Sequence, residues 1–158
     1  MNEYELCNAM KFHGNTVYRL ALCRTQNIAD AEDVYQDVFL RLFSQSAGDW
    51  DGEHLRAWLI RTTLNRCADL HRFRIRRPVL PLEELPDMVQ MTDETAELWD
   101  AVARLPEKLR IPIHLHYGEG YSTEEIAAML RVPSATVRTR LHRARTKLKD
   151  LLGGLNDE

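Results

Sequence analysis

Apolar residues recur at helical spacing along nearly the whole chain. Val34, Val38 and Leu42 step by four positions, and a longer stripe of the same kind runs through residues 137–148. No segment shows the sustained alternation of apolar and polar residues that a half-buried strand requires. Because an α-helix repeats every ~3.6 residues and a strand every second residue, this spacing predicts an all-α protein.

An acidic stretch broken by prolines divides the sequence. Pro78, Pro81 and Pro86 fall within it, and apolar periodicity is weak throughout. Proline lacks a backbone N–H and stops a helix, so the stretch is typical of a linker. A chain of 158 residues has room for two small domains. We therefore predict two small helical domains, residues 1–77 and 93–152, joined by a flexible acidic linker at residues 78–92.

Two helices are expected at the start of the chain. The first is expected at Tyr18–Cys23. Asn27 is expected to cap the second, because its side-chain oxygen can accept a hydrogen bond from an unpaired backbone N–H at a helix start. Phe39 and Leu40 are expected to widen the apolar stripe of this second helix.

Three more helices are expected before the C-terminal segment. After a loop at Ala47–Gly52, the pattern predicts a helix from about residue 55 to about residue 74. Beyond the linker it predicts helices at Thr95–Leu105 and Pro106–Tyr117. Pro112 lies inside the last of these, so we expect either a kink there or a late start of the helix.

The C-terminal segment has the pattern of a helix-turn-helix. Ser122 and Glu125 form an S-x-x-E capping box that opens one short helix. Ser134 is expected to cap a second helix after a turn at Arg131–Pro133. Ala127 is small where the two helices must approach closely. The apolar residues expected to pack inward are Ile126, Leu130 and Val132.

The second of these helices has one apolar and one polar, largely basic, face. The apolar stripe consists of Val137, Leu141, Ala144 and Leu148. The residues that remain for the outward face are Arg138, Thr139, His142, Arg143 and Thr146. Such side chains contact phosphates, and arginine also reads guanine edges with two hydrogen bonds. The pattern therefore predicts a DNA-recognition helix.

Charges of one sign are grouped along the sequence, although the net charge is only −3. Residues 55–77 contain seven arginines and one acid, and residues 131–149 contain seven basic residues and no acid. Acids gather at residues 30–37 and 78–103. This segregation indicates electrostatic contact surfaces more strongly than the net charge does.

The sequence shows no sign of a catalytic or metal site. The three cysteines form no C-x-x-C pair and no even set, which argues against a disulfide scaffold or a zinc ribbon. His114 and His116 are two residues apart and point to different faces of a helix, so they cannot form a metal-binding pair. There is no phosphate-cradling glycine-rich loop and no G-x-S-x-G motif. We expect a protein that is not an enzyme and that needs no cofactor.

No apolar run approaches the ~18–20 residues that would span a membrane. The first residues have neither the basic nor the apolar region of a signal peptide. A soluble, cytoplasmic protein with reduced thiols is expected.

Three segments of the chain resemble RNA polymerase sigma factors. Residues 30–42, DAEDVYQDVFLRL, resemble the core of sigma region two, and residues 55–65, LRAWLIRTTLN, resemble its promoter-melting segment. Leu105–Leu148 is similar to sigma region four. The segments cover most of the chain in this order, with no room for the region that separates them in larger sigma factors. The chain therefore resembles the extracytoplasmic-function (ECF) group of the sigma-70-like family.

The resemblance implies three contact surfaces. The residues implied in polymerase binding are Asp30, Asp33, Gln36, Asp37 and Arg41. Those implied at the minus-ten promoter element are Trp58, Arg61, Asn65, Arg66, Arg72, Arg74, Arg76 and Arg77. Those implied at the minus-thirty-five element are Arg138, Thr139, Arg140, His142, Arg143 and Arg145. Two alternatives stay open: a tryptophan such as Trp58 is more often a core residue, and an acidic helix face can be solvated without a partner.

The chain departs from the family pattern at two positions. Arg131 stands at a turn where many such factors have glycine, and a positive φ there would strain a non-glycine residue. Pro112 stands where the family more often continues a helix. Neither position belongs to the outward face of the recognition helix.

The resemblance also implies partners. These are core RNA polymerase, through the clamp helices and flap of its large subunits, and promoter DNA. An anti-sigma protein, often membrane-anchored, is implied as an inhibitor that could hold the chain at the membrane. No small-molecule substrate is implied.

Two other classes of function remain open. A free-standing helix-turn-helix regulator would bind its own operator as a dimer, but it leaves the acidic residues 30–37 and the basic residues 55–77 without a role. A helical adaptor would use its N-terminal domain for protein binding only.

Overall fold

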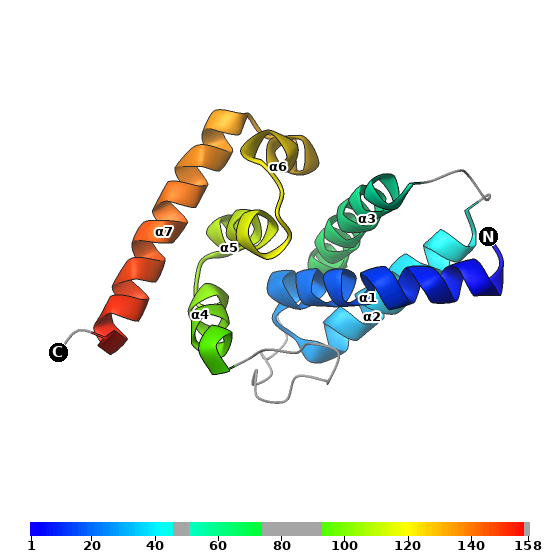
Figure 1. Ribbon diagram of the computed structural model, residues 1–158, viewed down its shortest axis with the longest axis horizontal. Helices are drawn as coiled ribbons and strands as arrows, with labels where there is room; N and C mark the ends of the chain where they lie inside the picture. Colours follow the sequence, from blue (N-terminus) through cyan, green and yellow to red (C-terminus); the bar gives the residue numbers. More distant parts are fainter. Residues whose placement is uncertain (46–50, 74–92, 157–158) are drawn as a thin grey trace. The chain divides into compact units, whose positions relative to one another are not determined.

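The computed structural model describes residues 1–45, 51–73 and 93–156. All regular secondary structure in these ranges is helical, which confirms the predicted all-α fold. The chain falls into two compact units, Met1–Val89 and Gln90–Glu158 (Figure 1). The predicted linker at residues 78–92 and most of the predicted loop at 47–52 lie outside the described residues. The boundaries of the two domains therefore stay predictions.

The first helix, α1 (Glu3–Thr25), is much longer than the segment predicted from its apolar residues. It begins at a capping box in which the Glu5 N–H donates to the Asn2 side chain (2.8 Å) and the Asn2 N–H donates to the Glu5 carboxylate (3.0 Å). It ends at Gln26, whose backbone is left-handed. The N-x-x-E pattern was the available signal for the helix start, because its polar first turns carry little amphipathic pattern.

The second helix, α2 (Ile28–Phe43), follows after a short connection. Asn27 caps it as predicted, with the Asp30 N–H donating to the Asn27 side chain at 3.0 Å. The predicted stripe is buried, but Leu40 is 66% exposed, so its assignment to that stripe is wrong. At about 100° per residue, Leu40 shares a face with Asp33 and Gln36 instead of with Val38.

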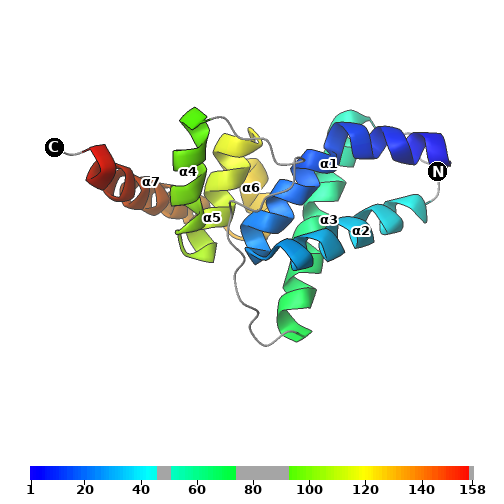
Figure 2. The ribbon, with the colours of Figure 1, turned by 90° about the horizontal axis from the view of Figure 1, so that it is seen from below.

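The third helix, α3 (Gly52–Phe73), packs against both α1 and α2. Its side of the interface is buried through Leu59, Ile60, Thr63 and Cys67. Figure 2 shows α1 and α2 as a hairpin that α3 crosses. The predicted helix over residues 55–73 is confirmed, and its predicted end near residue 74 lies outside the described residues.

In the second unit, the described residues 93–156 form four α-helices and one π-helical turn. They are α4 (Asp93–Ala103), α5 (Glu107–Ile113), the π turn η2 (His114–Gly118), α6 (Thr123–Leu130) and α7 (Ser134–Asn156). Figure 1 shows α4, α5 and α6 arranged along one side of α7, and each of them contacts α7. The core between them is formed by Leu105, Ile111, Leu115, Ile126, Val137 and Leu141.

Pro112 lies inside α5 and does not shift the start of that helix. α5 begins at Glu107 directly after Pro106, which excludes the late start, one of the two alternatives expected for Pro112. The irregularity follows Pro112 instead, as the π turn, where the Glu119 N–H donates to the His114 carbonyl oxygen at 3.1 Å. A proline has no N–H for the preceding turn, and a short helix that changes to wider turns is consistent with that loss.

Gly120 connects the π turn to the helix-turn-helix with a positive φ of 80°. We expect Gly120→Ala to lower the free energy of unfolding of the second unit by about 1–2 kcal/mol, because an L-residue is strained in this conformation. Hydrogen exchange of the buried α7 amides measures the change. Gly153→Ala is the matched control, because that glycine is helical and no atom lies within 4 Å of a Cβ added there. Equal hydrogen-exchange protection of the α7 amides in the two variants would show that the conformation of Gly120 does not require glycine.

Candidate polymerase-binding and promoter-binding surfaces

The predicted capping box opens α6. The Glu125 N–H donates to the Ser122 hydroxyl at 3.1 Å, and the Ser122 N–H donates to the Glu125 carboxylate at 2.9 Å. Hydrogen bonding to Ser122 holds the pKa of Glu125 below its usual value. The backbone of Ser122 has the larger effect and its side chain the smaller one. The start of the helix-turn-helix is therefore fixed by local hydrogen bonds, which explains why the sequence alone could predict it.

The turn between α6 and α7 contains the strained residue that the sequence suggested. Arg131 has a left-handed backbone with a φ of 58°, and its N–H donates to the Ala127 carbonyl oxygen. Ser134 is the first residue of α7 and not its cap, so that part of the prediction is wrong. The Thr136 and Val137 N–H groups donate to the Pro133 carbonyl oxygen, and the Ser134 hydroxyl accepts a hydrogen bond from Arg138.

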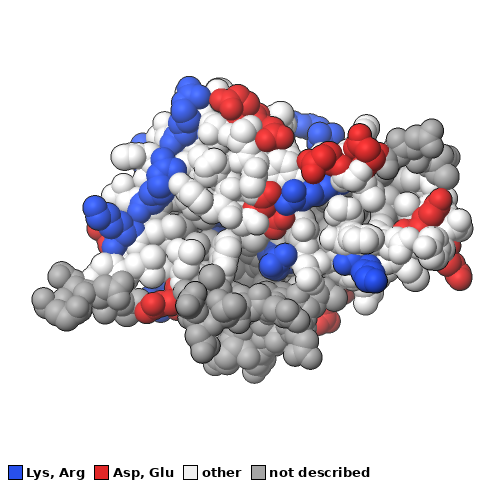
Figure 3. Space-filling view, in the orientation of Figure 1, with Lys and Arg blue, Asp and Glu red and all other residues white. Residues whose placement is uncertain are grey.

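The two faces of α7 agree with the prediction. The apolar stripe Val137, Leu141, Ala144 and Leu148 is buried. The residues predicted to face outward, Arg138, Thr139, His142, Arg143 and Thr146, are all exposed. Figure 3 shows Lys and Arg side chains in a row along this helix. The helix therefore offers a basic surface that packing within its own unit leaves free.

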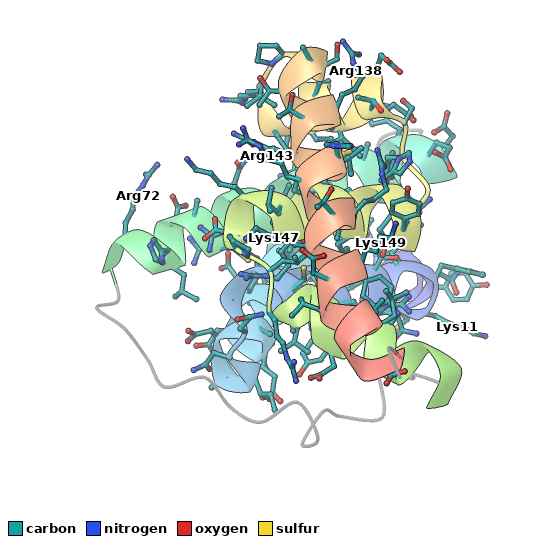
Figure 4. All side chains as sticks on the ribbon, turned by 90° about the vertical axis from the view of Figure 1, so that its left-hand side faces the viewer. Lys11, Arg72, Arg138, Arg143, Lys147 and Lys149 are labelled. Carbon is teal, nitrogen blue, oxygen red and sulfur yellow. The ribbon has the colours of Figure 1, made fainter. Side chains whose placement is uncertain are left out.

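The basic residues of α7 form two edges with a less charged strip between them. At about 100° per residue, Arg138, Arg145 and Lys149 lie along one edge. The opposite edge consists of Arg140, Arg143 and Lys147, and the strip between the edges consists of Thr139, His142 and Thr146. Figure 4 shows Arg143 and Lys147 on one side of α7 and Lys149 on the other. In a groove, the basic residues further along both edges can meet phosphates, while Arg138, Arg143 and the strip between them, in the first half of the helix, can reach the bases.

Tyr117 of the π turn contributes to this surface and was missed in the sequence. Its hydroxyl accepts a hydrogen bond from the Arg145 guanidinium at 3.0 Å, although the two residues are 28 positions apart. No spacing rule links such positions, because the contact exists only once η2 and α7 are packed in the same unit.

The candidate minus-ten residues of α3 divide into two groups. Trp58, Arg61, Asn65 and Arg72 follow one another at helical spacing, so they share one face. Arg61, Asn65 and Arg72 are exposed, whereas Trp58 is half-buried against the core of its unit. Arg66 lies beside this face and is also half-buried. Arg74, Arg76 and Arg77 lie outside the described residues.

The candidate polymerase-binding residues of α2 do not all share its exposed face. Asp33, Gln36 and Arg41 are exposed and Asp37 is half-exposed. Asp30 is only 8% exposed, in the first turn that Asn27 caps, so its side chain does not belong to this face. Leu40, which was expected in the buried stripe of α2, adds an apolar group to the exposed face.

Asp37 connects the α2 face with α3. Its Oδ2 atom lies 2.9 Å from the Arg41 Nε atom on its own helix and 2.5 Å from the Arg66 Nε atom of α3. Arg66 also pairs with Asp69 at 3.4 Å. Residues that were implied separately in polymerase and DNA binding are therefore in direct contact.

The two histidines considered as metal ligands have other roles. His114 is buried with its Nε2 atom 3.4 Å from the Glu119 carboxylate, and the His116 ring bonds to the Tyr121 carbonyl oxygen at 2.7 Å. Among the described residues, no group of three or more His, Cys, Asp or Glu side chains could hold a metal ion. In the same part of the chain, no helix is long and apolar enough to cross a membrane.

Comparison with known proteins places both units in one family. The model of sigma-70 region 2 matches residues 10–77, and that of sigma-70 region 4 matches residues 95–148. Two solved structures share the fold. They are the sigma factor RpoE in complex with the anti-sigma factor NepR from Bartonella quintana (TM-score 0.71, 21% identity, covering 94% of this chain and 96% of that chain) and CnrH in complex with the cytosolic domain of CnrY (TM-score 0.66, 29% identity, covering 99% and 92%).

Two curated relatives are ECF RNA polymerase sigma factors. SigE of Mycolicibacterium smegmatis is 37% identical over 157 residues, which cover 92% of this chain and 61% of SigE. SigM of Mycobacterium tuberculosis is 32% identical over 161 residues, which cover 98% of this chain and 81% of SigM. On this similarity along nearly its whole length, the chain belongs to the ECF RNA polymerase sigma factors, a family of transcription-initiation factors that are not enzymes.

Proposed function

We propose that this chain binds core RNA polymerase and directs it to a specific set of promoters. The observation that carries the proposal is the exposed basic face of α7 within a capped helix-turn-helix, in a chain whose other unit matches sigma-70 region 2. A free-standing regulator would need only the first of these features. No observation on the first unit favours that alternative.

The exposed face of α2 is proposed to bind a basic helix of the polymerase. Glu32 and Asp33 provide negative charge, and Leu40 provides apolar contact at the same face or beside it. Charge complementarity speeds the encounter and fixes the register, while a central apolar side chain adds buried area. Asp33, Gln36, Asp37 and Arg41 remain the candidate contacts, and Asp30 is left out because it is buried.

The exposed face of α3 is proposed to meet the minus-ten element. Arg61 and Arg72 are placed for phosphates, and Asn65 for hydrogen bonds to an unstacked base. Trp58 is half-buried against the core of its unit, and the exposed part of its side chain is proposed to contact such a base. The α7 surface is proposed to read the minus-thirty-five element through Arg138, Thr139, Arg140, His142, Arg143 and Arg145.

An anti-sigma protein is proposed as a further partner. CnrH, which shares the fold at 29% identity, is known in complex with the cytosolic domain of CnrY. An inhibitor that covers the α2 face would keep this chain from the polymerase, and a membrane anchor on that inhibitor would hold the chain at the membrane.

A band-shift experiment with promoter DNA, run with and without core polymerase, tests the proposed function. A sigma factor is expected to give a specific complex only when the core enzyme is present. Specific binding by the chain alone would indicate a free-standing regulator. A chain that changes neither the mobility of the DNA nor that of the core enzyme would indicate an adaptor.

A further inference from the structure

Arg66 differs from the other described arginines of the proposed minus-ten surface in where its side chain lies. It is 25% exposed, whereas Arg72 on the same helix is 75% exposed. Its position, one residue after Asn65, turns it away from the exposed face of α3 and toward α2. Figure 4 shows Arg72, in contrast, extending away from the ribbon at the end of α3.

Two carboxylates from different helices hold the Arg66 guanidinium. Its Nε atom is 2.5 Å from Asp37 Oδ2 on α2, and its Nη1 atom is 3.4 Å from Asp69 Oδ2 on α3. Asp37 Oδ2 also pairs with Arg41, and Asp69 pairs with Arg72 at 3.6 Å. Five residues therefore form a row of alternating charges across the two helices: Arg41, Asp37, Arg66, Asp69 and Arg72.

A phosphate would gain little from Arg66 in this arrangement. Each of the two carboxylates beside Arg66 offsets part of its charge and would repel a phosphate brought next to it, and the side chain would have to give up a half-buried ion pair to reach DNA. The same contact favours binding through Asp37. An arginine from a neighbouring helix fixes its carboxylate, so the carboxylate loses less conformational entropy when a partner binds.

We infer that Arg66 is a positioning residue for polymerase binding, which holds the Asp37 carboxylate on the α2 face, and that it is not a promoter-phosphate contact. This inference rests on the proposed function of α2. It assigns to polymerase binding a residue that the family resemblance implied in DNA binding. Arg66 and Arg72 of α3 then serve different partners although they lie six positions apart.

Arg66→Gln and Arg72→Gln in the full chain separate the two roles. Two quantities are measured: the affinity for core polymerase, and the salt dependence of promoter binding by the reconstituted holoenzyme. Arg66→Gln is expected to weaken core binding by roughly 3–30-fold, in the range of coupling between contacting residues, and to leave the salt slope unchanged. Arg72→Gln is expected to leave core affinity unchanged and to reduce the salt slope by about 1.

A double-mutant cycle with Asp37→Asn identifies the partner of Arg66. If Arg66 acts through Asp37, the double variant is expected to bind core polymerase no more weakly than the weaker single variant. Circular dichroism checks the fold. If the Arg66→Gln variant loses helicity, the same measurements are made on the Arg66→Lys variant, because lysine keeps the charge but not the planar guanidinium.

Two results would overturn the inference. One is a reduced salt slope with unchanged core affinity in Arg66→Gln, which would make Arg66 a phosphate contact. The other is unchanged core affinity in a folded variant with an unchanged slope, which would make the ion pair a feature without a role in binding. Failure of the proposed function itself is distinguishable, because the unmodified chain would then not bind core polymerase at all.

Discussion

Arg143→Ala is expected to reduce initiation about 5–150-fold at promoters with an intact minus-thirty-five element, and to relax the base preference there. This fold-reduction corresponds to the ~1–3 kcal/mol of discrimination that an arginine–guanine contact with two hydrogen bonds provides. Arg143 is exposed on the first half of α7, beside the strip of Thr139 and His142. Arg138→Ala, on the opposite edge of the helix, is expected to have an effect in the same range.

Lys149→Ala is the matched control, because Lys149 lies further along the same helix on the edge of Arg138. A lysine there is expected to meet only phosphate, so its loss weakens all sequences equally and reduces the salt slope by about 1. Transcription in vitro from a library randomised at the upstream element measures both effects. Unchanged base preference in both arginine variants would remove the assignment of α7 as the recognition helix.

Asp33→Lys is expected to weaken binding to core polymerase by about 10–100-fold while leaving the helical content intact. Asp33 is exposed on α2, on the face that also carries Gln36 and Leu40. In the variant, the new lysine faces a basic group of the polymerase. The repulsion between these like charges costs considerably more binding free energy than the loss of one exposed ion pair. Fluorescence anisotropy of the labelled chain titrated with core enzyme measures the affinity.

Glu97→Lys controls for the change in net charge. Glu97 is exposed on α4 in the other unit, and no residue of α4 is among those proposed to bind the polymerase. It is expected to leave core affinity within about twofold of the parent, because exposed charges away from a contact are largely screened. If Asp33→Lys binds as well as Glu97→Lys, the α2 face is not the polymerase-binding surface.

The helix-turn-helix shows why part of this protein could be predicted. The capping box of Ser122 and Glu125 and the buried stripe of α7 are interactions between residues three or four positions apart. The left-handed conformation found at Arg131, where the sequence showed only that a positive φ would cause strain, is also a property of a single turn. Such features depend on local geometry, which spacing in the sequence describes well.

The N-terminal unit shows where local rules fail. Leu40 has the residue type of a core position but lies on the exposed face of α2, and Asp30 has the type of a surface position but is buried. The apolar pattern of α1 was too weak to show the extent of that helix, which is defined by its Asn2 and Glu5 cap. In each case residue type alone was a poorer guide than angular position or capping geometry.

The sequence by itself determined that the chain is all-helical, that it contains a capped helix-turn-helix, and which residues of α7 face outward. Only the tertiary structure decided that Arg66 faces Asp37 and that Tyr117 holds Arg145. These contacts join separate helical elements, and their existence depends on how those elements pack. Periodicity describes the angle of a side chain around its own helix but carries no information about which neighbouring helix stands at that angle.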